Sequence, residues 1–373
     1  MHVLAINCGS SSLKYGLFEA KATEEKALLR GNVERIGEAV KNHAAAVDTV
    51  FAELSRKNLP PPEVVGHRVV HGGVDRSAPA LVDDALLAVL QGLIPFAPLH
   101  LPAEIEAMRA VAARWPGRPQ VACFDTAFHS TLPMVAKRYA VPDDLFATGV
   151  RRYGFHGLSY EYVVATIGAR DLGRAVLAHL GSGASMVAVR DGLAVDTTMG
   201  FTPSGGLVMA TRAGDIDPGL LIYLVRQGYD ARALGVLFNN RAGMLALSGS
   251  TGDVRELLAR RETDPRAALA LDVFVWNARK WLGAMVATIG GIDTLVFTGG
   301  IGEHAAPVRA AIATGFEYLG VRLDSGRNER GDAVVSPDGA ACRVRVVPTD
   351  EERVVVRHAR RVAGTKTSPP YPG

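Results

Sequence analysis

The feature that most constrains the fold of this 373-residue chain is an arrangement that occurs twice, once near the start of each half. In both copies an apolar run enters a turn of Gly and Ser residues, and a second apolar run leaves it. The copies span residues 3–15 and 175–187, with Gly9-Ser10 opposite Gly181-Ser182. This repeated strand–turn–strand pattern favours two related domains that face one cleft. Chance similarity of two hairpins is the alternative.

Around these hairpins, short β-rich runs alternate with longer helical patterns, which is typical of an α/β fold with covered sheets. Strands are predicted over 3–6, 13–18, 64–70, 121–124 and 294–298. Helices are predicted over 83–91, 102–114 and 264–289, from about 304, and over 350–362.

The length of the chain is too great for one ordinary core and predicts about two domains. We expect a first domain over 1–130, completed by a C-terminal helix at about 354–364, and a second domain over 131–353. Residues 365–373 are rich in Pro and Gly, so we expect a frayed tail there.

Bulk composition argues against several classes of protein. The 41 basic and 38 acidic residues give a net charge of +3 without blocks of like charge, so neither nucleic acid nor a membrane is expected as a partner. The chain lacks the pattern of a signal peptide and an apolar stretch of about 18 residues, so we expect a cytoplasmic protein. Cys8, Cys123 and Cys342 form no CxxC pair, and free buried thiols are expected.

The first Gly/Ser turn has the composition of an anion-binding loop. Residues 7–14 read Asn-Cys-Gly-Ser-Ser-Ser-Leu-Lys, which offers backbone N–H groups, three hydroxyls and an ammonium. Small side chains let the backbone approach a phosphate closely. The segment is not a Walker loop, because the GxxxxGK[ST] pattern is missing from the sequence. An ordinary hairpin turn is the alternative.

Two further small-residue segments support the same chemistry. Residues 179–185 read His-Leu-Gly-Ser-Gly-Ala-Ser, and residues 298–304 read Thr-Gly-Gly-Ile-Gly-Glu-His, a predicted turn between a strand and a helix. Gly300, Gly302 and Ala305 satisfy the GxGxxA pattern of dinucleotide-binding dehydrogenases, so an NAD-dependent dehydrogenase is one alternative for the function. That pattern normally opens a cofactor domain, whereas here it comes late in the chain. Three such segments fit one polyphosphate better than a dinucleotide.

Two arginines lie among Gly and Pro residues, Arg68 in segment 66–73 and Arg212 in segment 200–218. Like unit charges 4 Å apart cost about 4 kcal/mol at an effective dielectric near 20, so a carboxylate approaching a triphosphate needs fixed cations. Arginine suits this task because its guanidinium binds oxyanions bidentately. We predict that Arg68→Ala or Arg212→Ala lowers kcat at least about a hundredfold and leaves the fold intact. Surface ion pairs are the alternative.

Several histidines are candidates for the same site. His67 and His71 have the i, i+4 spacing of metal ligands on a helix, but their segment reads as a strand, which disfavours zinc. His156 lies in a turn of cations and aromatic residues, 151–157, and is a candidate donor to a transferring phosphoryl oxygen. A structural loop histidine is the alternative. His100 and His179 are interpreted as supporting hydrogen-bonding groups.

Acidic residues at two places are candidates for binding Mg²⁺. Glu351 and Glu352 lie at the predicted start of the last helix, where carboxylates also serve as plain partners of the helix dipole. Asp125 follows a predicted strand directly, at the carboxyl end where α/β folds place their chemistry.

Taken together, these segments resemble the acetate kinase family, of the superfamily that also contains sugar kinases, heat-shock ATPases and actin. The similarity runs from residue 3 to about 357 and includes two signature regions, 7–14 and 200–212. Further matching segments are 67–73, 124–129, 152–157, 298–303 and 349–352. The resemblance implies an α/β fold with two related domains of the actin-like ATPase (ribonuclease H-like) type flanking a nucleotide cleft. It also implies a homodimer.

The activity implied by the resemblance is reversible in-line transfer of the ATP γ-phosphoryl group to acetate, giving acetyl phosphate and ADP. Mg²⁺, or Mn²⁺, is the implied cofactor. A kinase for propionate or another short-chain carboxylate is the nearest alternative. A non-catalytic ATP-binding sensor on the same fold is an alternative of another class, because fold alone does not fix function.

The resemblance also implies roles for individual residues. Arg68 and Arg212 would hold the carboxylate and the equatorial phosphoryl oxygens, with His156 supporting the transition state and Asp125 fixing an arginine or the metal shell. The remaining roles are metal binding by Asn7 and Glu351, the phosphate path along Ser10, Ser12 and Lys14, a methyl pocket of Val70, Leu99, Phe155 and Pro203, and nucleotide binding by His179, Gly181, Ser182, Gly183, Asp253, Arg255, Gly300, Ile301 and Gly302.

The chain departs from the family pattern at a few positions. Ser182 and His304 each stand where the family usually has Asn, and Leu101 replaces the Asn of the usual Leu-His-Asn-Pro. Ser204-Gly205 stands in place of Leu-Glu, and the stretch 21–62 is shorter than usual. These departures bear on nucleotide choice and efficiency more than on reaction class, because both arginines and His156 are retained.

Overall fold

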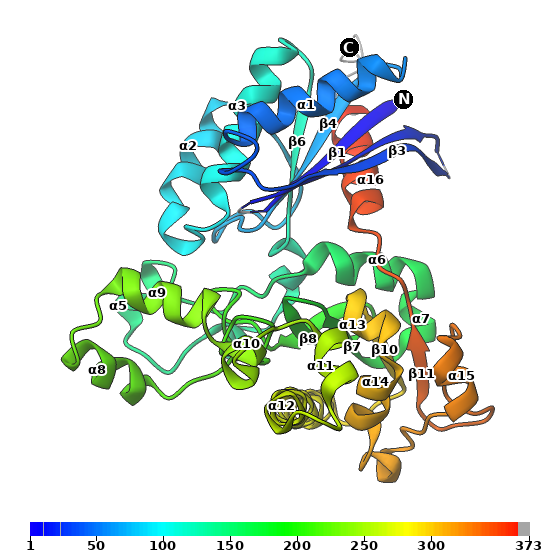
Figure 1. The fold of residues 1–373 in the computed structure, drawn as a ribbon. Helices are drawn as coiled ribbons and strands as arrows, with labels where there is room; N and C mark the ends of the chain where they lie inside the picture. The colour runs from blue at the N-terminus through cyan, green and yellow to red at the C-terminus, as the bar shows by residue number, and fades with distance from the viewer. Residues whose placement is uncertain (10, 23, 365–373) are drawn as a thin grey trace. The chain divides into compact units, whose positions relative to one another are not determined.

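The computed structural model describes residues 1–9, 11–22 and 24–364, and the chain divides into two compact units (Figure 1). Unit 1 comprises Met1–Phe128, Gly157–Tyr162 and the chain from Asp350 onward. Unit 2 comprises His129–His156 and Val163–Thr349. The tail that we expected to be frayed, 365–373, lies outside the described residues.

Unit 1 is built on a six-stranded sheet in the order β3-β2-β1-β4-β6-β5. Strand β1 pairs in parallel with β4, and β4 with β6, whereas the β1–β2, β2–β3 and β5–β6 pairs are antiparallel. The strands are β1 (His2–Cys8), β2 (Leu13–Ala20), β3 (Glu25–Val33), β4 (Val64–Val69), β5 (Ala80–Leu81) and β6 (Gln120–Phe124).

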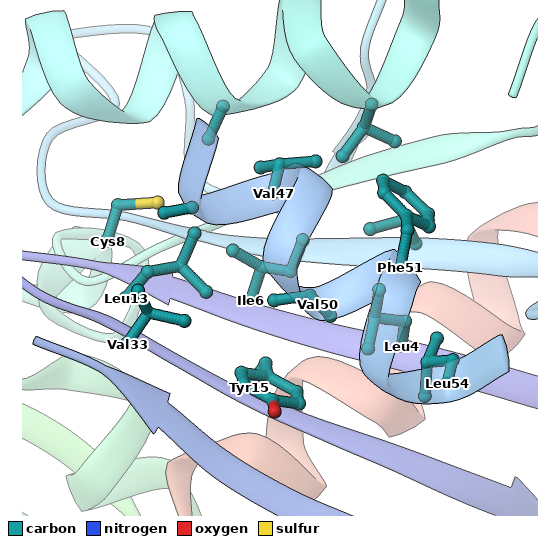
Figure 2. Close-up of a cluster of buried hydrophobic side chains, with 14 of the residues drawn as sticks. Leu4, Ile6, Cys8, Leu13, Tyr15, Val33, Val47, Val50, Phe51 and Leu54 are labelled. Carbon is teal, nitrogen blue, oxygen red and sulfur yellow. The ribbon is translucent and has the colours of Figure 1, made fainter. Parts of the chain in front are cut away.

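Helices cover both faces of this sheet. Successive side chains of a strand point to opposite faces, so Leu4 and Ile6 of β1 face one side and Val3 and Ala5 the other. The first side packs against α1 (His43–Arg56) and α3 (Leu101–Arg114), as Figure 2 shows for Leu4, Ile6 and the α1 side chains Val47, Val50, Phe51 and Leu54. The second side packs against α16 (Glu351–Gly364).

Unit 2 is built on a five-stranded sheet in the order β11-β10-β7-β8-β9. Its long helix α12 (Pro265–Ile289) packs against β7, β8 and β9, while α13 (Gly299–His304) packs against β7 and β10. The strands are β7 (Arg174–Leu180), β8 (Ala184–Arg190), β9 (Leu193–Thr197), β10 (Thr294–Thr298) and β11 (Arg343–Val346).

The two sheets share one connectivity. In unit 2, β7–β8 and β8–β9 are antiparallel and β7–β10 and β10–β11 are parallel, which repeats the pattern of β1, β2, β3, β4 and β6. The hairpin that occurs twice in the sequence is therefore the first pair of strands of each sheet. This confirms the prediction of an α/β fold with two related domains.

The remaining helices have at most 11 residues. Within the described residues, no helix combines the length and the apolar character needed to cross a membrane. These helices are α2 (Asp84–Gly92), α4 (Met134–Lys137), α5 (Asp143–Ala147), α6 (Gly157–Ile167), α7 (Ala169–Leu172), α8 (Pro218–Arg226), α9 (Ala231–Asn240), α10 (Gly243–Ser248), α11 (Val254–Arg260), α14 (Ala306–Ala313) and α15 (Ser325–Arg330), with 3₁₀ turns at Ile94–Phe96, Ala127–Thr131 and Glu317–Leu319.

Most of the elements predicted from sequence are present with small shifts at their ends. Local signals explain why: Asp83 caps α2 by accepting from the Leu86 N–H, Asp264 caps α12, and Pro102 lies in the first turn of α3. The three cysteines are buried free thiols, as predicted. The elements missed from sequence are strands β3, β5, β9 and β11 and helices α1, α4–α7, α9–α11 and α15.

The prediction of a Gly-rich turn over 298–304 was wrong, because this segment forms helix α13. Its first residue, Gly299, has a φ of 76°, which a glycine adopts without strain. The Gly299 N–H then donates to Oε1 of Glu303 at 3.0 Å, and the Thr349 N–H donates to the same oxygen at 3.1 Å. Glu303, one helical turn later, thus accepts the hydrogen bond from the first N–H of the helix. The composition of the segment did not reveal this contact.

Candidate active site

Arg68 lies near the end of β4 and is held by a buried carboxylate. Its Nε lies 3.2 and 3.1 Å from the two oxygens of Asp125, and its Nη2 lies 2.5 Å from Oδ2. Asp125 follows β6 directly and is fully buried. Because β4 and β6 are parallel neighbours, their carboxyl ends meet at one edge of the sheet and bring the two side chains together.

Two more residues of unit 1 contact the same guanidinium. Nη1 of Arg68 donates to Oδ1 of Asn7 at 3.0 Å, and Nε lies 3.7 Å from Oε2 of Glu351, the first residue of α16. Strand register explains the first contact, because Asn7 of β1 pairs with Arg68 on one side and Lys14 on the other. Burial lowers the pKa of Arg68, but the carboxylates of Asp125 and Glu351 raise it more, so the group remains a cation.

The predicted metal ligands Asn7 and Glu351 offer only oxygen donors, which suit a hard cation such as Mg²⁺. Across residues 1–9, 11–22 and 24–364, no group of three or more His, Cys, Asp or Glu side chains is arranged to hold a metal ion. Mg²⁺ in phosphoryl-transfer enzymes is usually held by one or two carboxylates, waters and the substrate phosphates, so these two residues fit it. Glu352 instead lies 3.3 Å from Arg30.

The turn between β1 and β2 is closed by its own backbone. The Gly9 N–H donates to the carbonyl oxygen of Ser12 at 2.8 Å, and Nε2 of His43 lies 2.8 Å from the Gly9 carbonyl oxygen. Lys14 is exposed and Ser12 is half-buried. Ser10, which was predicted to bind phosphate, lies outside the described residues.

In unit 2, His156 has a left-handed backbone, with φ 59° and ψ 24°, immediately before α6. Its Nδ1 lies 2.9 Å from the hydroxyl of Ser185, which is fully buried on β8. Its ring stacks on that of His179 with centroids 4.2 Å apart. His179 and Ser185 are register partners in the β7–β8 hairpin, so the hairpin itself fixes the orientation of the His156 ring.

Arg212 and His156 approach the same place from different segments. A Cβ added to Gly183 would lie 3.4 Å from Nε2 of His156 and 3.5 Å from Nη1 of Arg212. Nη1 of Arg212 also donates to the carbonyl oxygen of Pro203 at 3.1 Å. Gly183 therefore keeps a space open beside an imidazole and a guanidinium, the kind of space that a small anion can fill.

Beside the Gly181-Ser182 turn, unit 2 contains a cavity of about 550 Å³, the size of a small-molecule binding site. Six residues with a predicted nucleotide-binding role line it: Gly181, Ser182, Asp253, Arg255, Gly300 and Ile301. Its lining further includes Ala210, Thr211, Gly252, Val254, Leu258, His304, Ala305 and Pro307. Gly302 is buried in α13, and His179 and Gly183 belong to the His156 cluster.

At the rim of this cavity, Asp253 caps α11 and forms an ion pair with Arg255. Nη2 of Arg255 lies 2.6 Å from Oδ2 of Asp253, and the Arg255 side chain is otherwise exposed. The hydrogen bonds from Arg255 lower the pKa of Asp253 to about 2. This exposed ion pair lines the cavity but contributes little to the stability of the fold.

The four residues of the predicted methyl pocket fall in both units. Val70 in unit 1 is buried, whereas Leu99 is 44% exposed. In unit 2, Phe155 is buried, its carbonyl oxygen lies 2.9 Å from Nε2 of His129, and Pro203 is half-buried.

Two residues beside these clusters were missed from sequence. Ser185 contacts His156, and its place in a Gly/Ser-rich hairpin opposite His179 was the available signal. Glu104 of α3 accepts from the Val70 N–H, and a charged residue on the apolar face of a helix was the signal there. Both contacts join segments that are distant in sequence, which residue types alone do not reveal.

Two sheets share this strand order, with Arg68 on β4 of the first and Arg212 in a loop beside the β7–β8 turn of the second. This combination is typical of phosphotransferases of the actin-like ATPase fold class. Sequence comparison narrows the class, because residues 2–357 match the Acetokinase family. The chain is 44% identical over 382 residues to a protein named acetate kinase from Micrococcus luteus, covering 96% of this chain and 98% of that protein. This chain belongs to the acetokinase family.

Solved structures agree with that assignment. An acetate kinase from Porphyromonas gingivalis superposes with a TM-score of 0.88 at 36% identity, covering 97% of this chain and 99% of that one. A propionate kinase from Francisella tularensis superposes with a TM-score of 0.91 at 32% identity and the same coverage.

Proposed function

We propose that this chain catalyses reversible transfer of the γ-phosphoryl group between ATP and acetate, giving acetyl phosphate and ADP. Membership of the acetokinase family and similarity along nearly the whole chain to proteins named acetate kinase support this reaction. A bond forms between an acetate oxygen and the γ-phosphorus while the bond from that phosphorus to the bridging oxygen breaks, so ADP leaves with the bonding electrons.

Positive charge is the main requirement of this reaction, because the carboxylate and the triphosphate repel each other. Arg68 and Arg212 are proposed to hold the carboxylate and the equatorial oxygens of the phosphoryl group. Asp125 is proposed to keep the Arg68 guanidinium in one orientation through three contacts. Preoriented donors of this kind stabilise charge that develops in the transition state without further reorganisation.

The single observation that carries the proposal is the convergence of His156 Nε2 and Arg212 Nη1 beside Gly183. Ser185 holds the opposite ring nitrogen of His156, so Nε2 is directed toward this space. A transferring phosphoryl group here would accept hydrogen bonds from both side chains. An arginine in this role accelerates phosphoryl transfer on the order of 10³–10⁵-fold.

The nucleotide and the metal would use the remaining predicted residues. The 550 Å³ cavity with its Gly181-Ser182 and Gly300-Ile301 walls would hold the nucleoside end of ATP, with Ser10, Ser12 and Lys14 along the phosphates. Mg²⁺, or Mn²⁺ in its place, would be held by Asn7 and Glu351 and, when bound, neutralises charge on the phosphates.

A hydroxylamine-trapping assay tests the reaction directly. The protein is incubated with ATP, Mg²⁺, acetate and hydroxylamine, and acetyl phosphate is detected as acetyl hydroxamate. We expect hydroxamate that depends on both acetate and ATP. Binding of ATP without any hydroxamate would contradict the proposal and would favour a non-catalytic ATP-binding sensor.

A preference for propionate is the second candidate, favoured by the structural similarity to a propionate kinase. One methylene group in an apolar pocket changes binding by only about 1–3 kcal/mol, so substrate length depends on small differences in packing. Values of kcat/KM for acetate, propionate and butyrate decide the question. We expect acetate to give the highest value, and a clear propionate preference would reverse the choice.

The assembly proposed for the chain is a cytoplasmic homodimer. Helix α8 exposes several apolar side chains along a single stretch, which is unusual for a surface in contact with water alone. These side chains are Leu220, Ile222, Tyr223 and Val225. Light scattering of the purified protein is expected to give twice the chain mass, and Ile222→Asp is expected to shift it toward one chain mass.

A further inference from the structure

A buried carboxylate near Arg68 has no part in the proposed chemistry so far. Glu104 lies in the first turn of α3 and is 2% exposed. Both of its oxygens accept from the backbone N–H of Val70, each at 3.2 Å. A carboxylate with so little contact with water is costly to bury, so its place in the fold requires a reason.

Val70, the partner of Glu104, lies where strand β4 ends. Val70 follows the last residue of β4 and is two residues beyond Arg68. The β4–β6 pairing ends beside it, where the Asp125 N–H donates to the Val69 carbonyl oxygen at 2.9 Å. Glu104 therefore accepts a hydrogen bond from the backbone at the point where β4, the strand that contains Arg68, leaves the sheet.

The electrostatic environment agrees with this position. Burial raises the pKa of Glu104 to about 8, and the nearby positive charge of Arg68 and the Val70 hydrogen bond act in the opposite direction. The Glu104 carboxyl and the Arg68 guanidinium thus interact electrostatically, although the hydrogen bonds of Glu104 go to the backbone. Asp125 holds the guanidinium from one end, and Glu104 holds the main chain from which it extends.

We propose that Glu104 is a positioning residue that fixes the Val70 backbone and thereby the placement of Arg68 for carboxylate binding. This inference rests on the proposed function, because it concerns the acetate site of that reaction. Loss of the acceptor would leave a buried N–H without a partner, which costs about 1–3 kcal/mol. The effect would be concentrated on the carboxylate substrate, since Val70 is also a predicted part of the methyl pocket.

The test compares KM for acetate with KM for ATP in Glu104→Ala, Glu104→Gln and the control Glu106→Gln. Glu106 lies on the same helix but is more exposed and contacts the Ala44 N–H at 3.5 Å. We expect Glu104→Ala to raise KM for acetate about tenfold, with KM for ATP changed less than about twofold. Glu104→Gln keeps a carbonyl acceptor and is expected to stay within about threefold of wild type, as is Glu106→Gln.

A further variant covers the case in which Glu104→Ala fails to fold. Glu104→Asp keeps the carboxyl group but withdraws the acceptor by one methylene group, and it is expected to raise KM for acetate at least about fivefold. Equal changes in both KM values, or an unchanged KM for acetate in Glu104→Ala or Glu104→Asp, would overturn the inference. A wild-type protein that forms no acyl hydroxamate would instead overturn the proposed function.

Discussion

The carboxylate of Asp125 is fully buried and meets the guanidinium of Arg68 through three contacts, the shortest of 2.5 Å. Asp125 also lies where the parallel strands β4 and β6 end together. The Asp125–Arg68 ion pair is therefore part of the packing of unit 1 and also part of the proposed catalytic site. Removing either partner would leave the other charge without its principal counterion.

Arg68→Ala is expected to lower the unfolding free energy of the protein as well as its kcat. Breaking a buried pair by removing one partner costs about 3–5 kcal/mol of unfolding free energy. Our expectation from sequence that this variant leaves the fold undisturbed is therefore revised by the burial of Asp125. Urea denaturation followed by circular dichroism measures the loss, with Arg35→Ala, which breaks an exposed pair with Glu38, as the control. Equal midpoints for Arg68→Ala and wild type would contradict this account.

Gly183→Ala is expected to impair catalysis with little effect on folding. The added Cβ would lie 3.4 Å from Nε2 of His156 and 3.5 Å from Nη1 of Arg212, in the space proposed for the phosphoryl group. We expect kcat to fall at least about tenfold while the unfolding free energy changes by less than about 1 kcal/mol. Gly92→Ala, where the new Cβ meets nothing within 4 Å, serves as the matched control. Wild-type turnover in Gly183→Ala would show that this space is not used.

Acid is expected to destabilise the protein partly through His67. Burial lowers the pKa of His67 to about 4, although its hydrogen bond with Gln120 acts in the opposite direction. Between the ordinary pKa of about 6.5 and this value, the unfolded chain binds a proton that the folded chain does not. Stability from this group is therefore fully present above pH 6.5 and is lost as the pH falls toward 4.

The measurement compares wild type with His67→Asn in urea titrations at pH 4.5, 5.5 and 6.5. The unfolding free energy of the wild type is expected to fall more steeply with acid, by at most about 1.4 kcal/mol per pH unit. Parallel curves for the two proteins would show that His67 makes no contribution to acid sensitivity.

Much of the fold could be predicted from sequence because its signals are local. The Gly/Ser hairpins and the capping residues Asp83 and Asp264 depend on neighbours within a few positions. Helix α13 could not be predicted, because its Gly-rich sequence is stabilised by Glu303 and by a contact with Thr349 from a distant segment. Strand β11 has only four residues, and its Arg-Val-Arg-Val alternation is the shortest pattern that indicates a half-buried strand.

In the candidate site, the residue types could be predicted from sequence, but the contacts between separate elements could not. Residue types and their order identified Arg68, His156 and Arg212 as candidates before any geometry was available. The contacts of Ser185 with His156 and of Glu104 with Val70 join separate elements, so only strand register and helix packing reveal them. Exposure was also not evident from residue type, since Leu99 and Val70 are both apolar and only Val70 is buried.

Arg212→Ala offers the most direct test of the central claim that fixed guanidinium groups enable the phosphoryl transfer. Nη1 of Arg212 donates to the carbonyl oxygen of Pro203 at 3.1 Å and lies beside the space that Gly183 leaves open. The measurement is kcat for acetyl phosphate formation at saturating ATP and acetate, with the circular dichroism spectrum as the folding control. We predict a fall of at least about a hundredfold with an unchanged spectrum. A kcat within about tenfold of wild type would contradict the account.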